Sequence, residues 1–282
     1  MVRATLNYLR PGGPPNRRFV APGAEMNTGI YDPYEVEVTD ARPIRPTLAS
    51  HGFALLDHAT AVADFTDAAE VDRLYYAEAD ALIRGVTGAS LTIPFGWMLR
   101  SNGATGVGRQ PPAADVHVDL TPDRAERIAR VFLAREGLAE RRPSRFLITS
   151  LWRAYSPPPQ DCPLALCAGD SVGEDEGVPN VMIHVDALPD AETAIARRPD
   201  DGQYPAASVF AFNPAHRWHY FPDMTRDEVV LLTFYDSARG PNWRVPHTAF
   251  VDPAVQGAPP RESIELRSIA YWFDDIAEET IA

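Results

Sequence analysis

The 282-residue chain contains no lysine, because all 26 of its basic side chains are arginines. Chemistry that needs a lysine Schiff base, as in pyridoxal-phosphate enzymes and class I aldolases, is therefore excluded. Acidic residues outnumber basic ones, 39 against 26, so that the formal net charge at pH 7 is −13. A chain of this charge repels a phosphate backbone, and nucleic acid is not an expected partner.

Cysteine and long apolar runs are also scarce. The only cysteines are Cys162 and Cys167, whose spacing fits neither a disulfide framework nor a zinc cluster, so we expect buried thiols. No apolar run approaches the roughly 20 residues of a membrane helix. The first residues lack the apolar core of a signal peptide. We therefore expect a cytoplasmic protein without a membrane partner.

The composition favours one domain. Of all residues 45% are hydrophobic, which is enough for a sizeable core, and all-β chains of this length commonly form a single domain. We assign residues 1–282 to it. Residues 10–30 are rich in proline, glycine and arginine without any periodicity. This composition predicts that residues 1–35 form an extended N-terminal arm.

Two segments have helical patterns. Residues 66–85 begin with Asp67 and Glu70 at the spacing of a capping box and end at a glycine. Residues 121–137 begin with a capping threonine followed by proline, the residue favoured at the first helical position. We expect one helix in each segment.

The other periodic segments are short apolar runs between turn residues, which indicates antiparallel strands. There are about eight, a number typical of a double-sheet jelly roll. The sequence therefore predicts a mainly β fold, a jelly roll or double-stranded β-helix with flanking helices. The expected strands lie in residues 91–100, 115–119, 145–155, 163–171, 208–214, 228–237, 245–253 and 261–273.

The tripeptide His-Val-Asp occurs twice, at His117 to Asp119 and at His184 to Asp186. Residues i and i+2 of a strand point to the same face, so either copy can aim an imidazole and a carboxylate at one metal ion. One more histidine would complete the facial triad of two histidines and one carboxylate that holds Fe(II) with open positions. The tripeptide alone is a weak signal, since many histidines only pack or face solvent.

Strand order favours the first copy. In a jelly roll with such a site, four core strands separate the ligand pair from the distal histidine. Four expected strands lie between His117 and His247, whereas only two lie between His184 and His247. We therefore predict His117, Asp119 and His247 as ligands, and interpret His184 as part of a loop or edge. His216 and His219 stay open as alternatives to His247, although their spacing of three does not suit two ligands on one strand face.

The last expected strand carries two arginines. Alternation places Arg261, Ser263 and Arg267 on one face, where guanidinium and hydroxyl groups can grip a carboxylate at two points. The distal carboxylate of 2-oxoglutarate suits such a site. The alternative is an ordinary ladder of surface ion pairs with Glu262 and Glu265.

The chain resembles the hydroxylase/desaturase family of fungal and bacterial secondary metabolism, which includes a fungal gibberellin desaturase and a protein of cephamycin 7-methoxylation. The similar segments span roughly residues 50–270, and the most specific are NPAHRWHYFPDMTRDEVVLLTFYDS, VPHTAFVDP and PRESIELR. The order of the aspartate, distal histidine and late arginines is also similar to that of the taurine dioxygenase type. This resemblance supports His247 as a ligand and Arg261 as the 2-oxoglutarate anchor, with Arg267 close by.

The resemblance implies the cofactors Fe(II), 2-oxoglutarate and O₂, and an iron(IV)-oxo species that removes hydrogen from a C–H bond of a small molecule. The reaction would be hydroxylation or desaturation of an amino acid or a natural-product intermediate. For the substrate we name four side chains that can line the pocket, and arginines there would suit an anionic substrate. They are Arg100, Trp152, Arg153 and Tyr271.

Two other functions remain open from the sequence. One is a non-catalytic accessory subunit of a biosynthetic enzyme complex, because the cephamycin relative works with a partner protein. The other is a metal-dependent hydrolase or a cupin-like isomerase that uses the same ligands with another metal.

Overall fold

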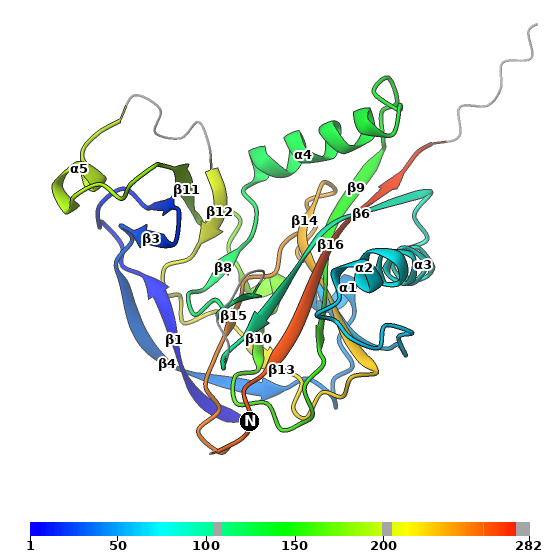
Figure 1. Ribbon diagram of the computed structural model, residues 1–282, viewed down its shortest axis with the longest axis horizontal. Helices are drawn as coiled ribbons and strands as arrows, with labels where there is room; N and C mark the ends of the chain where they lie inside the picture. The colour runs from blue at the N-terminus through cyan, green and yellow to red at the C-terminus, as the bar shows by residue number, and fades with distance from the viewer. Residues whose placement is uncertain (104–108, 199–204, 256, 275–282) are drawn as a thin grey trace, which may run out of the picture.

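The computed structural model describes residues 1–103, 109–198, 205–255 and 257–274, which form two sheets (Figure 1). The larger sheet has ten strands in the order β1-β4-β13-β10-β15-β8-β12-β11-β2-β3, and the smaller has six in the order β5-β14-β9-β16-β6-β7. The strands of the larger sheet are β1 (Val2–Leu9), β2 (Arg17–Ala21), β3 (Ala24–Asn27), β4 (Tyr31–Asp40), β8 (His117–Val118), β10 (Leu164–Cys167), β11 (Val178–His184), β12 (Pro205–Val209), β13 (Trp218–Tyr220) and β15 (His247–Ala249). Those of the smaller sheet are β5 (Phe53–Asp57), β6 (Leu91–Ser101), β7 (Arg109–Gln110), β9 (Arg145–Ala154), β14 (Glu228–Asp236) and β16 (Glu262–Trp272).

The helices are short apart from two. They are α1 (Leu48–His51), α2 (Ala68–Glu70), a π-helical turn η1 (Val71–Tyr75), α3 (Tyr76–Thr87), α4 (Pro122–Arg135), a 3₁₀ turn η2 (Gly169–Ser171) and α5 (Ala191–Ile195). None of the described helices is long and apolar enough to cross a membrane.

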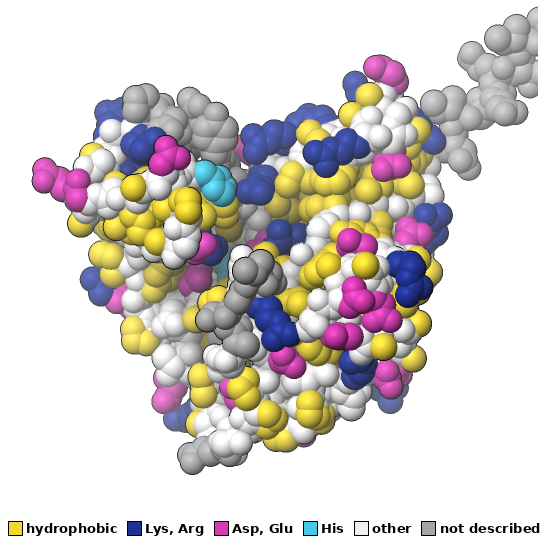
Figure 2. Space-filling model, viewed as in Figure 1, with side chains coloured by type: hydrophobic (Ala, Val, Ile, Leu, Met, Phe, Trp, Pro, Cys, Tyr) yellow, Lys and Arg dark blue, Asp and Glu magenta, His cyan; other side chains and the backbone are white. Residues whose placement is uncertain are grey.

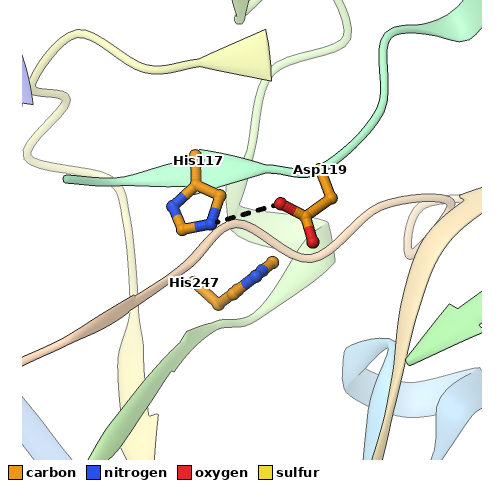
Figure 3. Close-up of side chains that lie close together, drawn as sticks. All are labelled: His117, Asp119 and His247. Atoms are coloured by element: carbon orange, nitrogen blue, oxygen red, sulfur yellow. Dashed lines mark ion pairs between the residues drawn. The ribbon is translucent and has the colours of Figure 1, made fainter. Parts of the chain in front are cut away.

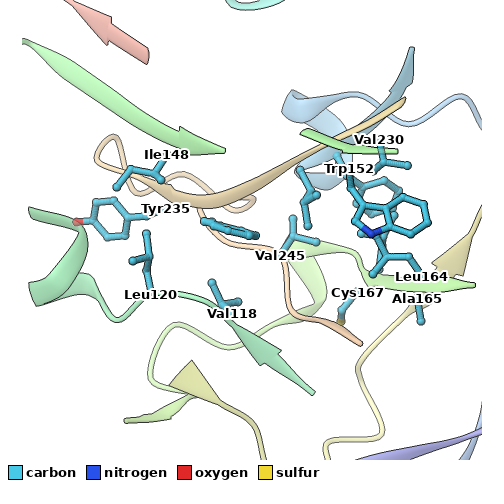
Figure 4. Packing of buried hydrophobic residues seen from close by; sticks show 14 of the residues in the cluster. Val118, Leu120, Ile148, Trp152, Leu164, Ala165, Cys167, Val230, Tyr235 and Val245 are labelled. Carbon is cyan, nitrogen blue, oxygen red and sulfur yellow. The ribbon is translucent and has the colours of Figure 1, made fainter. Parts of the chain in front are cut away.

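The main hydrophobic core lies between the two sheets. Val118 and Leu166 reach it from the larger sheet, and Trp152 and Val230 from the smaller one (Figure 4 shows Val118, Trp152 and Val230). A second cluster lies on the other face of the smaller sheet, beneath α2, η1 and α3. The smaller sheet is therefore buried on both faces.

Burial on both faces explains the continuous apolar runs of the smaller sheet. In β14, Val230 and Leu232 point into the main core, while Val229 and Leu231 point toward the helices. In β16, Ile264 also faces the helices, so the odd-numbered residues of that strand face the larger sheet. This alternation decides which side chains of β16 reach the functional site.

Both expected helices are present. Asp67 caps the first by accepting hydrogen bonds from the amides of Ala69 and Glu70. Glu70 does not close a capping box, because its carboxylate instead accepts from the amides of Ala63 and Asp64. This helix passes the predicted stop at residue 85 and ends at Gly88, whose φ of 67° is the left-handed conformation that glycine adopts without strain.

The second helix, α4, begins as predicted. The Thr121 hydroxyl accepts a hydrogen bond from the Arg124 amide, and Pro122 occupies the first helical position. Its buried residues are Ala125, Ala129 and Leu133, which join the core between the sheets.

The N-terminal residues differ from the predicted arm. Residues 2–40 contain strands β1 to β4, and Leu6 and Tyr8 of β1 are fully buried. β2 pairs in parallel with β11, and β4 pairs in parallel with β13. These partners are more than 150 residues away in sequence, and the proline- and glycine-rich stretch between β1 and β4 shows no local period that would announce them.

The count of about eight strands was too low. Six strands, β9 to β14, lie between β8 and β15 in the described residues, rather than the predicted four. β11 was missed because its alternation is interrupted by proline and asparagine, and β13 lies beyond the expected strand of residues 208–214, which overlaps only β12. Cys162 and Cys167 are both free thiols and buried, as predicted.

Helix α4 should stabilise the fold through its small buried face. We expect Leu133→Ala to lower the free energy of unfolding by about 2–5 kcal/mol, because it opens a cavity in the core. Val131→Ala, on the exposed side of the same helix, should change it by less than about 1 kcal/mol. Urea denaturation followed by circular dichroism measures both, and equal losses would contradict this packing.

Candidate active site

Three side chains from two distant parts of the sequence converge between the sheets. One possible ligand atom from each of His117, Asp119 and His247 lies within 4.8 Å of the other two. The rings of the two histidines are 4.5 Å apart, and Nε2 of His117 is 3.5 Å from a carboxylate oxygen of Asp119. Figure 3 shows the three groups turned toward one point. In the described residues this is the one cluster of at least three His, Cys, Asp or Glu side chains that could hold a metal ion.

The pairing of β8 with β15 brings the histidines together. His117 and His247 are directly opposite each other in the antiparallel register. Asp119 follows β8 by one residue and points to the same side as His117. Nearest neighbours across a sheet lie only about 5 Å apart, so two ligands are set by strand pairing alone.

Backbone carbonyl groups orient both imidazoles. Nδ1 of His117 is 2.7 Å from the carbonyl oxygen of Asp115, and Nδ1 of His247 is 3.1 Å from that of Val245. A carbonyl oxygen can only accept, so each Nδ1 carries the proton and donates. The lone pair of each ring is then on Nε2, the arrangement of a metal-binding histidine.

Asp119 is held from the other sheet. Nη2 of Arg267 donates to a carboxylate oxygen of Asp119 at 2.7 Å, and Nε of the same guanidinium donates to Glu265 at 2.9 Å. Burial alone would raise the pKa of Asp119, but Arg267 and the two histidines hold it well below its usual range. Asp119 is therefore ionised, as a metal ligand must be.

His247 is deeply buried and stacks on Phe234, with ring centroids 5.3 Å apart. Burial, and then the neighbouring His117, lowers the pKa of His247 to about 3. The imidazole is thus neutral near pH 7 and available to a metal ion.

A narrow cavity starts at the histidine pair and runs toward Arg261. His117, His247, Trp152 and Glu265 line it, together with the fully buried Arg261. Nη1 of Arg261 donates to the carbonyl oxygen of Cys162 at 2.6 Å, but its Nε has no hydrogen-bond partner in the described residues. Burial lowers the pKa of Arg261 to about 10, so the group stays charged at neutral pH.

A second, larger cavity of about 900 Å³ opens beside His117. His117 and Asp119 form one wall, and the hairpin of β2 and β3 forms another. Figure 2 shows this hollow between the part of the molecule that carries β2, β3 and β11 and the part that carries α4. Arg100 lines both cavities and so lies at their junction.

The structure places the other predicted residues in different surroundings. Ser263 faces the interior, with a buried hydroxyl that has no partner in the described part of the chain. Arg153 points to the opposite face of β9, where it binds His58 and Tyr75, and lines neither cavity. Tyr271 is buried below α4 and donates to the carbonyl oxygen of Ala129. Neither Arg153 nor Tyr271 therefore reaches the site.

The rival histidines lie elsewhere. His216 is hydrogen-bonded to Tyr8 and Glu176. His219 is buried beside the rings of His51 and Phe53. His184 is exposed, as is Asp186. His184 is the last residue of β11, an inner strand of the larger sheet, so the predicted loop or edge position fits only Asp186, which follows the strand.

Comparisons with known proteins agree with this arrangement. A family model described as "Oxidoreductase/YMDC permease-like domain" matches residues 6–271. The "Hydroxylase/desaturase efuI" of Hormonema carpetanum is 31% identical, with 98% of this chain and 97% of that protein covered. The "Fe(II)/2-oxoglutarate-dependent dioxygenase nvfI" of Aspergillus novofumigatus is 31% identical, with 89% and 87% covered. The solved structure of the "iron and alpha-ketoglutarate-dependent endoperoxidase NvfI" superimposes with a TM-score of 0.81 at 28% identity, covering 96% of this chain and 98% of that one.

The chain belongs to the Fe(II)/2-oxoglutarate-dependent hydroxylase/desaturase family. The predicted mainly β jelly-roll fold and the predicted enzyme class are confirmed by these matches. The accessory-subunit alternative is disfavoured, since this hydroxylase/desaturase retains the complete His-Asp-His cluster.

One site residue was misjudged from the sequence. Glu265 was considered only as a partner in a surface ladder, yet it is buried beside Arg267 and lines the narrow cavity. Burial raises its pKa, against the opposing effect of Arg267. Alternation would have revealed it, because position 265 shares the face of Arg261 and Arg267.

The neutral state of buried His247 should make the metal-free hydroxylase/desaturase less stable in acid. The unfolded chain takes up a proton near pH 6.5, whereas the folded chain does so only near pH 3, so stability falls as pH falls between these values. We expect the stability advantage of wild type over His247→Gln to shrink by up to about 1.4 kcal/mol per pH unit in this range.

Urea denaturation at pH 7, 6 and 5 measures the effect, and His184→Gln is the control because His184 is exposed. A wild-type pH dependence that His247→Gln leaves unchanged would contradict the assignment.

Proposed function

We propose that His117, Asp119 and His247 bind Fe(II), that Arg261 anchors 2-oxoglutarate, and that the enzyme hydroxylates or desaturates a small natural-product intermediate. The observation that carries the proposal is the convergence of the three side chains within 4.8 Å. Support comes from relatives named as hydroxylase/desaturase and as 2-oxoglutarate-dependent dioxygenases.

The donor set suits the metal. Two neutral imidazoles and one carboxylate are the facial triad that binds non-heme iron and leaves coordination positions open. Nε2 of each imidazole is directed away from its backbone partner. Arg267 occupies one carboxylate oxygen of Asp119, which leaves the oxygen near His117 for the ion.

The narrow cavity suits 2-oxoglutarate. It joins the histidine pair to a buried guanidinium whose Nε has no partner among the described residues. A buried donor without an acceptor is costly, and a carboxylate would satisfy it. We assign the distal carboxylate to Arg261, with the unpartnered hydroxyl of Ser263 close along the same strand face.

The large cavity suits the substrate. Two of its arginines are already paired, Arg18 with Glu25 and Arg109 with Glu262. Arg100 donates from Nη1 to the carbonyl oxygen of Pro111 and lies 4.0 Å from Glu265, at the boundary with the cofactor cavity. We propose that Arg100 contacts the substrate, and that an anionic group on the substrate faces this guanidinium.

In this arrangement the protein mainly orients its ligands. When bound, iron and 2-oxoglutarate together supply the O₂ activation that oxidation of a C–H bond requires. The hydrogen-bonded imidazoles and the Arg267-held carboxylate keep the ligand atoms in place, and the apolar core beneath them excludes water.

The metal assignment predicts a weak visible charge-transfer band when Fe(II) and 2-oxoglutarate are added anaerobically to wild type. His247→Ala should reduce the band to background, because one of three ligands is lost. His216→Ala should keep it, since His216 lies outside the cluster. Absence of the band in wild type, or the opposite behaviour of the two variants, would refute the proposed triad.

The two late arginines should have different effects. Arg261→Gln should raise the concentration of 2-oxoglutarate at half-maximal band intensity by about 100-fold, with unchanged Fe(II) affinity. Arg267→Gln should mainly weaken Fe(II) binding, by about 10- to 100-fold, because it releases Asp119. Titrations of each ligand separate the effects, and a larger loss of 2-oxoglutarate affinity in Arg267→Gln would transfer the anchor role to Arg267.

A further inference from the structure

A third cavity lies on the outer side of the metal site, between α4 and β6. It has a volume of about 440 Å³, and we call it the α4–β6 groove. Residues 95–98 of β6 form its lower wall. In the described residues no strand pairs with them on the side away from β16, because β7 pairs only with Leu99 and Arg100. Glu265 and Arg267 form its floor. The groove thus reaches the back of the Asp119 ion pair without opening into the large cavity.

The walls of the groove are apolar. Phe95 and Phe132 pack with ring centroids 4.7 Å apart, and Ile128 continues this surface. Val131 at the rim is 42% exposed. Figure 2 shows this apolar band directly below the basic side chains of α4. The cavity volume lies in the range of small-molecule sites, about 300–1,000 Å³.

The upper rim is basic in a chain that is acidic overall. Arg124 and Arg127 lie one turn apart on the groove side of α4, and Arg135 covers Phe132 farther along. Neither Arg124 nor Arg127 forms an ion pair in the part of the chain that the structure describes. Burial, and then the neighbouring Arg267 and Arg127, lowers the pKa of Arg124, against an opposing effect of Asp119. Glu265 is the one carboxylate of the lining, and Arg267 already binds it.

We propose that the α4–β6 groove binds a small amphipathic carboxylate, with its carboxylate at Arg124 and Arg127 and its carbon chain against the aromatic wall. Guanidinium groups recognise carboxylates by paired, charge-assisted hydrogen bonds, and an exposed apolar surface gains by being covered. The groove shares no lining residue with the large cavity and only Glu265 with the narrow cavity.

The test uses octanoate as the probe and the enzyme loaded anaerobically with Fe(II) and 2-oxoglutarate, so that no turnover occurs. Isothermal titration calorimetry should show one octanoate bound per chain, and 1-octanol should bind at least about tenfold more weakly. The double variant Arg124→Gln/Arg127→Gln should weaken octanoate binding by about tenfold or more. Arg130→Gln is the matched control, because Arg130 is an exposed arginine of the same helix that does not line the groove.

The charge-transfer band separates this proposal from the proposed function. The double variant should keep the band, and octanoate should not bleach it. Octanoate binding that the double variant leaves unchanged, or that displaces 2-oxoglutarate, would overturn the groove assignment. A wild-type dimer that the double variant converts to monomers in sedimentation velocity would show that a second copy covers the groove, which would also overturn it. Loss of the band from wild type would refute the proposed function without affecting the octanoate result.

Discussion

The ion pair between Asp119 and Arg267 joins the two sheets at the point where the chemistry is expected. Asp119 follows β8 of the larger sheet, and Arg267 belongs to β16 of the smaller one. Both groups are largely removed from water, so breaking the pair would leave an uncompensated buried charge. The position of the carboxylate therefore depends on the packing of one sheet against the other, and the site cannot form in an isolated half of the fold.

The same contact shows why arginine serves here where lysine would not. The guanidinium of Arg267 uses Nη2 for Asp119 and Nε for Glu265, so one planar group fixes two carboxylates at once. An ammonium group is a compact point charge on a flexible stem and does not impose this geometry. Arg153 also directs separate nitrogens to fixed partners inside the protein, and Nη1 of Arg261 donates to the carbonyl oxygen of Cys162. A chain without lysine can thus bury cations that remain charged and oriented.

Patterns local to a strand could be read from the sequence. The alternation of β16 correctly placed Arg261, Ser263 and Arg267 on the interior face, and period two also placed His117 beside Asp119. The choice between the two His-Val-Asp copies needed long-range information, and the strand count selected the copy that converges with His247, although it missed two of the intervening strands. Trp152, predicted for the substrate pocket, lines the narrow cavity and not the large one, and the adjacent Arg153 lies on the opposite face of β9.

The strands that could not be predicted from the sequence depend on partners that are distant along the chain. β2 and β4 pair with their neighbours β3 and β1, but also in parallel with β11 and β13, which lie more than 150 residues further along the chain. The local spacing of apolar residues does not predict such pairing, so the N-terminal segment was interpreted as an arm. The consequence is functional, because the hairpin of β2 and β3 forms a wall of the large cavity. The part of the sequence that was hardest to interpret is therefore the part that shapes access to the metal site.

The two inner cavities meet at a shared boundary. Arg100, Ala113 and His117 line both of them, whereas Arg261 lines only the narrow one and Asp119 only the large one. A cosubstrate held at Arg261 and a substrate in the large cavity would therefore approach the same metal position from different sides. Arg100 is the one charged side chain on both surfaces, so its guanidinium would face the carboxylate of either ligand. Such a shared cation would couple the binding of the two ligands, because its position in one complex sets the field that the other encounters.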